Sequence, residues 1–422
     1  MEEADFIISS AAELVTLAGP NRPRVKKEMD DLGIVRDGGV AVKGGEIVAV
    51  GKTEELLADY RGKIIDAAGK LVMPGFIDDH VHLVFAGSRE DELELMIKGV
   101  TYPELKKRGK GMQVTLARTG EASDEELEAQ NTRILDCMLL HGTTTIEAKS
   151  GYEMTPKGEI RQLEIINRLN ERHPIDLIPT FCAQTIPASN EPDEFVDLVI
   201  DEMIPPIAKR KLARYCDVYR EDIEGYFTEE QARRILEAGR EHGMDLRIHA
   251  DWLTPSGGAE LAAELDVVTA DHLVFSSDKG LDQMADKGVI GVLLPTSPFC
   301  YLGRYARAKE IIEKGVPVAI GTDISAINMC ESMQVMIALA CLQMHMTPAQ
   351  AITASTINAA YGINEGHEVG SIEVGKKADL VIFDAPNHKF FPFHYGINLV
   401  DKVFKNGKMM VENGALIRQE ET

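Results

Sequence analysis

The chain is organised around the stretch Pro74-Gly75-Phe76-Ile77-Asp78-Asp79-His80-Val81-His82-Leu83. After a Pro-Gly turn, a short apolar and acidic run leads to two histidines with one residue between them. In an extended strand, residues i and i+2 point to the same face, so the spacing predicts that His80 and His82 present their imidazoles together. Imidazole is the commonest metal ligand, so this face is a candidate site for one divalent ion. The alternative is an accidental pair, with one ring in the core.

Composition limits the class of protein and its partners. The chain has 422 residues, 44% of them hydrophobic, enough for a large core, and a single α/β barrel often exceeds 250 residues. The formal net charge of −23 argues against nucleic acid or an anionic membrane as a partner. The acidic start lacks the basic segment of a signal peptide, and no apolar run reaches the ~20 residues that span a bilayer. Six scattered cysteines with no C-x-x-C pair fit reduced thiols, so we expect a cytoplasmic protein.

Both ends of the chain predict short β-strands. Two strands near the N-terminus are joined at Gly44-Gly45, a two-residue hairpin signal, and the C-terminal part has a similar turn at Asn406-Gly407. Two β-rich ends around a different middle predict one small β domain built from residues 1–70 and 370–422. Residues 71–369 then form the catalytic body.

The middle of the chain alternates between strand and helix patterns. Helix starts are predicted at Ser123 and Thr228, which open capping boxes, and at Thr155-Pro156. Strands are predicted over residues 143–146, 175–181, 215–219, 245–249, 267–270, 289–294 and 316–320. This repeat indicates an α/β fold of the (β/α)8 TIM-barrel type. A doubly wound open sheet is the alternative, although no Gly-x-Gly-x-x-Gly opens a helix here.

The active residues of such a barrel lie at the carboxyl ends of its strands. His80 and His82 end the first strand, and His249, His272 and Asp323 end later ones. Histidines and an aspartate from separate strands are typical of a hydrolytic metal site with one open position for water. We expect Asp323 to ligate the ion and take the proton of the water, and His272 to be a fourth ligand or a proton donor. Each residue alone is explained equally well as a cap or a core residue.

Lys149 ends the strand that begins at Thr143 and has two interpretations. A carbamylated lysine at this place would bridge two metal ions. The simpler interpretation, which we favour, is an ion pair with Glu147 or a neighbouring carboxylate.

These motifs resemble the amidohydrolase superfamily and, within it, the imidazolonepropionase family. The resemblance covers nearly the whole chain and is carried by the following segments: Pro74-Gly75-Phe76-Ile77-Asp78 with His80-Val81-His82, Phe85 to Glu90, Glu147 to Tyr152, Ala270 to Leu273, Val292 to Pro295, Thr322-Asp323 and Val369 to Asp379. It implies a distorted (β/α)8 barrel with a β-sandwich from both termini, and a homodimer. It also implies one divalent metal ion, zinc or iron, bound by His80, His82, His249 and Asp323.

The resemblance further implies a clamp for the propionate carboxylate of the substrate, formed by Arg89 and Tyr152 with Tyr102. A guanidinium suits this role because it pairs with a carboxylate through two parallel hydrogen bonds. The alternative for Arg89 is a surface salt bridge with Glu90 or Asp91.

Three places depart from the family pattern. Trp252 stands where the family has a glutamate, and indole does not act as a general acid or base near neutral pH. Gln184 is nearest to the place of a family histidine, and Ile324 to Asn328 replace Asn-Pro-Gly after Asp323. Loss of one catalytic acid typically costs ~10²–10⁴ in rate. We therefore assign Gln184 and Trp252 to substrate binding, and three changes in one pocket favour a changed substrate.

The sequence thus predicts a metal-dependent hydrolase that breaks a C–N bond of a small five-membered cyclic amide with a carboxylate arm. The nearest substrate is 4-imidazolone-5-propionate, which gives N-formimidoylglutamate in histidine degradation. One alternative is a diverged enzyme acting on a hydantoin or thiohydantoin ring, or a deaminase. Another is a catalytically silent homologue that binds metal or ligand.

Overall fold

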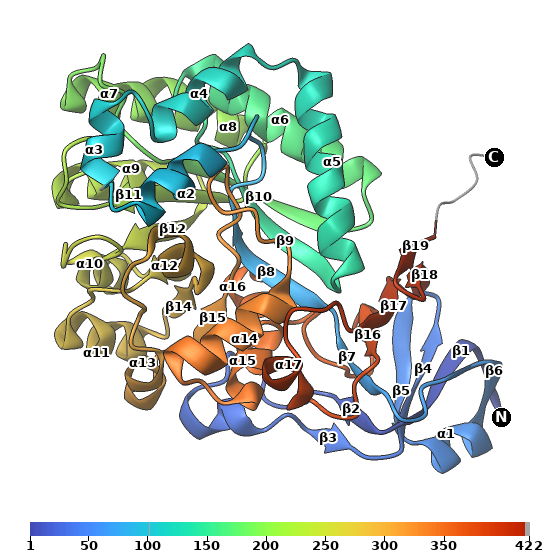
Figure 1. The fold of residues 1–422 in the computed structure, drawn as a ribbon. Helices are drawn as coiled ribbons and strands as arrows, with labels where there is room; N and C mark the ends of the chain where they lie inside the picture. Colours follow the sequence, from blue (N-terminus) through green and yellow to red (C-terminus); the bar gives the residue numbers. More distant parts are fainter. Residues whose placement is uncertain (101, 418–422) are drawn as a thin grey trace.

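The computed structural model describes residues 1–100 and 102–417; the side chains of Tyr102, Pro103 and Lys106 also lie outside the described residues. An eight-stranded parallel sheet forms the centre of the molecule, and its strands lie side by side in chain order (Figure 1). This order confirms the predicted barrel and excludes the doubly wound sheet, whose strand order reverses. The strands are β8 (Phe76–Val81), β9 (Thr143–Lys149), β10 (Asp176–Ala183), β11 (Tyr215–Arg220), β12 (Asp245–Ala250), β13 (Thr269–His272), β14 (Ile290–Leu293) and β15 (Val318–Ile320).

Amphipathic helices cover the outside of the sheet. The predicted capping boxes at Ser123 and Thr228 are confirmed, and Pro156 occupies the first turn of its helix. The helices after the first strand are α2 (Glu90–Ile97), α3 (Tyr102–Lys107), α4 (Met112–Glu121), α5 (Asp124–Leu140), α6 (Pro156–Arg172), α7 (Pro192–Leu198), α8 (Ile204–Lys209), α9 (Glu229–Glu241), α10 (Gly258–Glu264), α11 (Asp278–Lys287), α12 (Thr296–Tyr301), α13 (Ala308–Lys314), α14 (Met333–Met344), α15 (Pro348–Ala354) and α16 (Ile357–Gly362). A π-helical turn, Val199–Met203, joins α7 to α8.

The barrel closes between its first and last strands. The N–H of Asp323 donates to the carbonyl of His80 at 3.0 Å, and the N–H of His82 donates to the carbonyl of Ile324 at 3.0 Å. An isolated parallel bridge joins Val81 to Ile324 at the same place. The seam of the barrel therefore runs through the residues predicted to bind metal.

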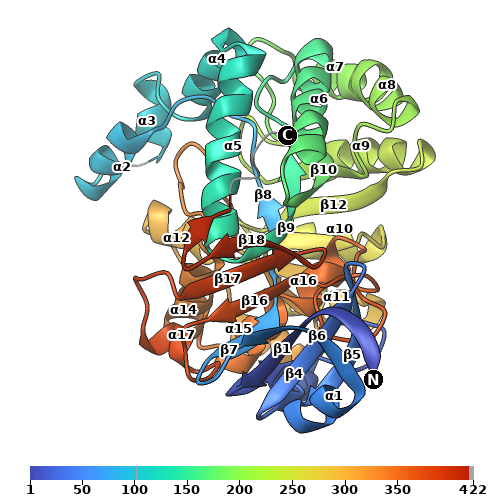
Figure 2. The same cartoon turned by 90° about the vertical axis from the view of Figure 1, so that its right-hand side faces the viewer.

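Two further sheets lie at the side of the barrel (Figure 2). One has the order β5 (Glu46–Lys52), β4 (Gly38–Lys43), β1 (Glu2–Ala11), β6 (Tyr60–Asp66), and α1 (Thr53–Asp59) connects two of its strands. The other combines both ends of the chain in the order β19 (Ala415–Leu416), β18 (Lys408–Glu412), β17 (Val400–Lys405), β16 (Leu380–Phe383), β7 (Leu71–Pro74), β2 (Glu13–Val15), β3 (Ile34–Val35). The rings of Phe6 and Phe404 stack between the sheets with centroids 5.0 Å apart.

The composite sheet is joined directly to the barrel. Strand β7 pairs with β16 in that sheet, and after Gly75 the chain continues at once as β8 of the barrel. A short helix, α17 (Phe390–Phe393), lies against α14 (Figure 1). The exact division at residues 70 and 370 stays a prediction.

None of the helices in the described parts of the chain has the length and apolar character needed to cross a membrane. All six cysteines are free.

Candidate metal centre and active site

Three histidines from two strands converge at the carboxyl end of the barrel. The Nε2 atom of His82 lies 3.3 Å from Nε2 of His80 and 3.4 Å from Nε2 of His249. All three side chains are buried, and their candidate ligand atoms lie within 4.8 Å of one another, close enough to bind one metal ion. The local cause is the two-residue spacing of His80 and His82 at the end of β8, and closure of the barrel brings the end of β12 to the same mouth.

Carboxylates behind two of the imidazoles set their orientation. His80 Nδ1 lies 2.7 Å from Asp271 Oδ2, and His249 Nδ1 lies 3.2 Å from Asp217 Oδ1. We assign the proton of each ring to Nδ1, because each Nδ1 faces a carboxylate oxygen that can accept a hydrogen bond. The Nε2 atoms of His80 and His249 then keep their lone pairs, as metal-ligating nitrogens do, and both rings lie next to His82. The residues therefore fit a divalent metal ion.

Burial favours the neutral form of these rings. Loss of solvation lowers the pKa of His80 and of His82 well below the ordinary value of 6.5, and the nearby Lys149 and His249 act in the same direction. A neutral imidazole is the form that ligates metal.

Asp323 completes the group from the last strand. Its Oδ1 atom lies 3.6 Å from the Nε2 atoms of both His80 and His82. Burial raises the pKa of Asp323 to about 8. Its backbone φ of +53° lies in the left-handed region, which is uncommon outside glycine and occurs at functional sites. The side chain is thus held next to the histidines by a constrained backbone.

His272 lies beside this group rather than within it. Its ring centroid is 5.4 Å from that of His249 and 5.6 Å from that of His80. Its Nε2 atom is buried and has no hydrogen-bond partner among the described residues, and its backbone φ is +77°. Burial lowers the pKa of His272 well below 6.5, so the ring is neutral. This placement suits a group that acts on a bound substrate.

Lys149 forms buried ion pairs. Its Nζ atom lies 2.8 Å from Asp217 Oδ2 and 3.0 Å from Glu147 Oε1, and all three side chains are fully buried. Burial opposes its charge, but Asp217 and Glu147 outweigh burial and raise its pKa. These contacts correspond to the ion-paired interpretation of Lys149. The ammonium also fixes Asp217, the carboxylate that orients His249.

A small cavity of about 40 Å³ adjoins His82 and Asp323. Most of the residues predicted for the site line it: His82, Arg89, Tyr152, Gln184, Trp252 and Asp323. Tyr102 is also predicted for this site, but its side chain lies outside the described residues. Among the described residues that line this cavity, Asp323 is the only carboxylic acid.

Arg89 is buried at the start of α2. The alternative of a surface salt bridge with Glu90 or Asp91 is wrong, because Arg89 is buried and forms an ion pair with the buried Glu92. Arg89 Nε and Nη2 lie 3.0 Å and 2.6 Å from Glu92 Oε2. Glu92 in turn accepts a 2.9 Å hydrogen bond from the N–H of Gly111. Glu92 therefore links the Arg89 guanidinium to the backbone of Gly111 and holds it at the wall of the cavity.

Trp252 is fixed by an acid from the neighbouring strand end. Glu221 accepts hydrogen bonds from the N–H groups of Trp252 at 2.6 Å, Leu253 at 2.9 Å and Thr254 at 3.0 Å. The indole ring packs on His272, with centroids 5.1 Å apart and 30° between planes. The ring therefore forms a firm wall of the site.

Sequence reasoning missed the residues that support the site. Asp217 and Asp271 were not assigned a role, and the cavity walls Tyr219, Tyr226 and Tyr301 were not recognised. A usable signal was present for Asp217, because it is a charged residue in a strand that is otherwise mostly apolar. No comparable signal marks Tyr301, which lies on a short helix after β14.

Comparisons with known proteins agree with this geometry. Residues 71–410 match the amidohydrolase family, and residues 38–62 match an imidazolonepropionase-like composite domain of bacteria. The chain is 49% identical to an imidazolonepropionase of Geobacillus kaustophilus (strain HTA426), over 97% of this chain and 98% of that protein. It is 47% identical to an imidazolonepropionase of Alkaliphilus metalliredigens (strain QYMF), over 98% and 99%. The chain belongs to the amidohydrolase family and, within that family, to the group of the imidazolonepropionases.

Solved structures share the fold at much lower identity. An adenosine deaminase from Xanthomonas campestris with bound zinc has a TM-score of 0.71 and 20% identity, covering 99% of this chain and 95% of that chain. A triazine hydrolase variant has a TM-score of 0.73 and 16% identity, covering 98% and 96%. These likenesses concern the fold alone.

Proposed function

We propose that this chain hydrolyses 4-imidazolone-5-propionate, or a closely similar five-membered cyclic amide with a carboxylate arm, as its named relatives suggest. One observation carries the proposal: the Nε2 atoms of three buried histidines and a carboxylate of Asp323 converge beside a cavity that Arg89 also lines. Such a site combines a place for a Lewis acid with a group that binds a carboxylate.

Arg89 binds and orients the substrate. Its guanidinium pairs with the carboxylate arm, and Tyr152 lines the same cavity. Glu92 keeps the guanidinium in place when substrate is absent. Binding at a remote arm places the ring against the histidines, which converts binding energy into orientation of the reacting carbon.

One zinc or iron ion would be held by His80, His82, His249 and Asp323, and when bound it supplies an activated water at neutral pH. Asp323 accepts a proton from the attacking water and returns it to the ring nitrogen as the C–N bond breaks. The ring carbonyl carbon becomes a carboxylate and the nitrogen leaves with the proton. His272 polarises the ring carbonyl from the side.

A second candidate substrate is a hydantoin-type ring with the same acidic arm. Gln184 and Trp252 line the cavity with an amide and an indole, and Asp323 is the only acid among its described lining residues. The side-chain amide of Gln184 is uncharged and can both donate a hydrogen bond to a ring carbonyl and accept one from a ring N–H. This arrangement supports a ring with an additional carbonyl.

The assembly and the compartment are proposed as well. We propose a homodimer, because Phe393, Tyr395 and Ile397 expose large apolar side chains close together in the chain. Light scattering of the purified protein measures the assembly. The expected compartment is the cytoplasm.

The decisive experiment is turnover of 4-imidazolone-5-propionate by zinc- or iron-loaded protein, followed by loss of the ultraviolet absorbance of the ring. His249→Ala serves as the blank. Turnover that is abolished in the blank supports the proposed reaction. A folded, metal-bound protein that turns over neither this ring nor hydantoin-5-propionate would refute it and favour a silent homologue.

A further inference from the structure

A second, much larger cavity lies directly outside the catalytic one. Its volume is about 830 Å³, compared with about 40 Å³ for the inner cavity. The larger volume falls in the range of typical ligand pockets. We call it the outer chamber; it is bounded by residues of α2, α3 and α12 and by the segments after β11, β12 and β13.

The outer chamber adjoins the active-site cavity. Tyr226, Trp252 and Tyr301 line both cavities. Trp252 and Tyr301 meet edge to face, with ring centroids 5.1 Å apart and 74° between planes. A group bound against these rings in the inner cavity therefore lies next to the outer chamber.

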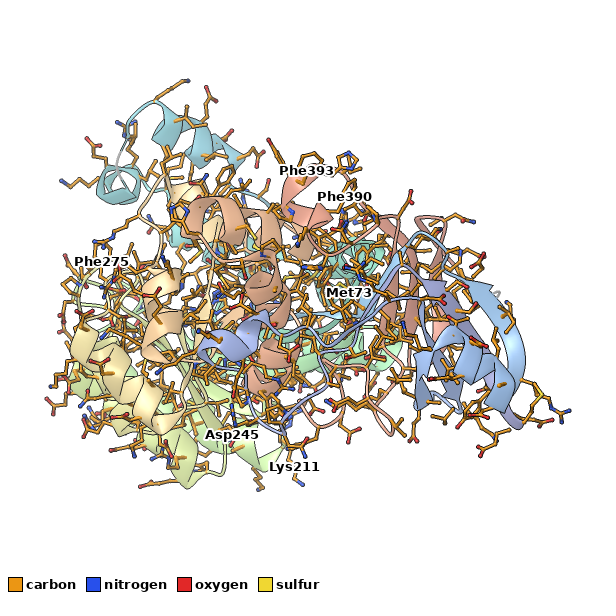
Figure 3. All side chains as sticks on the ribbon, turned by 90° about the horizontal axis from the view of Figure 1, so that it is seen from below. Met73, Lys211, Asp245, Phe275, Phe390 and Phe393 are labelled. Atoms are coloured by element: carbon orange, nitrogen blue, oxygen red, sulfur yellow. The ribbon has the colours of Figure 1, made fainter. Side chains whose placement is uncertain are left out.

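The lining of the outer chamber is predominantly apolar. Met96 and Val100 lie on one side, and Val274 and Phe275 on another. Figure 3 shows Phe275 at the end of the molecule opposite the N-terminal sheet. The guanidinium of Arg304 lies over the Phe275 ring, 5.5 Å from its centroid, so the rim of the chamber also carries a positive charge in a cation–π contact. Such a surface binds apolar and aromatic groups by removing them from water.

The side chain of Trp252, at the boundary of the two cavities, is held firmly by its neighbours. Glu221, which is buried, holds the backbone of Trp252 through hydrogen bonds to three successive N–H groups. The indole also packs on His272 and on Tyr219, whose ring centroid is 5.8 Å away. The indole is therefore a fixed ring that borders both the reacting centre and the outer chamber.

We propose that the outer chamber is a substrate subsite for an apolar substituent of aryl size, attached to the cyclic amide that the inner site hydrolyses. This inference rests on the proposed function and extends it to substituted rings. The chemical step is unchanged: water adds to the ring carbonyl carbon, the C–N bond breaks, its nitrogen takes the proton, and the substituent stays attached to the product.

Trp252 reports binding by itself, because it is the only tryptophan in the chain. The test compares hydantoin-5-propionate with its two N-benzyl derivatives on the metal-loaded protein, by tryptophan fluorescence and by calorimetry. We expect at least one benzyl derivative to bind about tenfold tighter than the parent compound, or more. Binding of both derivatives no tighter than the parent compound would overturn the proposal.

Two variants locate the effect. Ile223 lines the outer chamber and is 38% exposed, so Ile223→Asp places a hydrated charge there. A Cβ added at Gly303 meets nothing closer than 3.9 Å, so Gly303→Leu fills the space without a backbone clash. Both variants should lose most of the preference for the benzyl compound. Leu342→Asp, an exposed site on α14, is the matched control and should keep it. An unchanged preference in both chamber variants would contradict the subsite.

Turnover of the same compounds separates this proposal from the proposed function. Tight benzyl binding without turnover of any ring supports the subsite and refutes the proposed reaction. Turnover of the parent compound without any benzyl preference supports the reaction and refutes the subsite.

Discussion

The backbone N–H of Asp323 donates a 3.0 Å hydrogen bond to the carbonyl oxygen of His80. This bond joins the last strand end of the barrel to the first. The two side chains that leave this pair of residues are a proposed proton acceptor and a proposed metal ligand. Closure of the barrel and assembly of the site are therefore one structural event.

Replacement of Asp323 by asparagine separates these two roles. Asparagine tolerates the φ of +53° and keeps the backbone bond, but it accepts no proton. We expect kcat to fall by ~10²–10⁴ with little change in the melting temperature. Asp323→Ala, which is strained at this φ, should lose stability as well. Normal turnover by Asp323→Asn would exclude Asp323 as the proton carrier.

Asp217→Asn tests the carboxylate behind His249. Without the carboxylate of Asp217 at Nδ1, neither the tautomer nor the orientation of the His249 ring is fixed. We expect metal affinity to fall by ~10–100-fold, measured by competition with a fluorescent chelator. Asp286→Asn, on the exposed face of α11, is the control. Equal affinity in both variants would show that Asp217 does not support the ligand.

Arg89→Lys tests the carboxylate clamp. Lysine keeps the charge but loses the planar fork that pairs with a carboxylate through two hydrogen bonds. We expect kcat/KM to fall by roughly 10–100-fold, mainly through KM. A substrate analogue without the carboxylate arm is the control, because the variant and the native protein should hydrolyse it equally. A similar loss with both compounds would mean that Arg89 acts through the fold instead.

Lys149→Met tests the buried ion pairs. The substitution keeps an unbranched side chain that is one atom shorter, and it leaves the carboxylates of Asp217 and Glu147 without their ammonium. We expect the free energy of unfolding to fall by ~3–5 kcal/mol, measured by chemical denaturation. Lys157→Met, at an exposed position on α6, should unfold like the native protein. Activity that depends on added bicarbonate would instead favour a carbamylated Lys149.

The buried carboxyl group of Glu159 should make the free energy of unfolding depend on pH. It is buried and accepts hydrogen bonds from the N–H groups of Met154 at 2.7 Å and Glu153 at 3.2 Å, in the loop that follows Tyr152. Burial raises the pKa of Glu159 from 4.5 to about 7. The native state thus keeps this proton over a range in which the unfolded state loses it, and stability falls as the pH rises from 4.5 to 7.

Glu159→Gln removes this contribution. Relative to the native protein, we expect the variant to gain stability between pH 4.5 and pH 7, by at most about 3 kcal/mol. Unfolding midpoints measured across this range check the expectation. Glu171→Gln, an exposed site on the same helix, should run parallel to the native protein. A constant difference between Glu159→Gln and the native protein would contradict the raised pKa.

The sequence alone determined the class of fold and most of the residues of the site. The period of two in His80-x-His82 and the alternation of strands with capped helices are local patterns, and local patterns follow from backbone geometry. Because the carboxyl ends of barrel strands meet at one mouth, the strand pattern also predicts that His249, His272 and Asp323 lie together.

The tertiary structure alone decided what surrounds those residues. The register between β11 and β12 sets Tyr219 opposite His249, and the two rings stack with centroids 4.3 Å apart. The register also places Asp217 behind the same histidine, and the packing of α2 and α12 leaves the outer chamber open. Strand register and helix packing depend on contacts between residues far apart in the chain, so no local pattern encodes them.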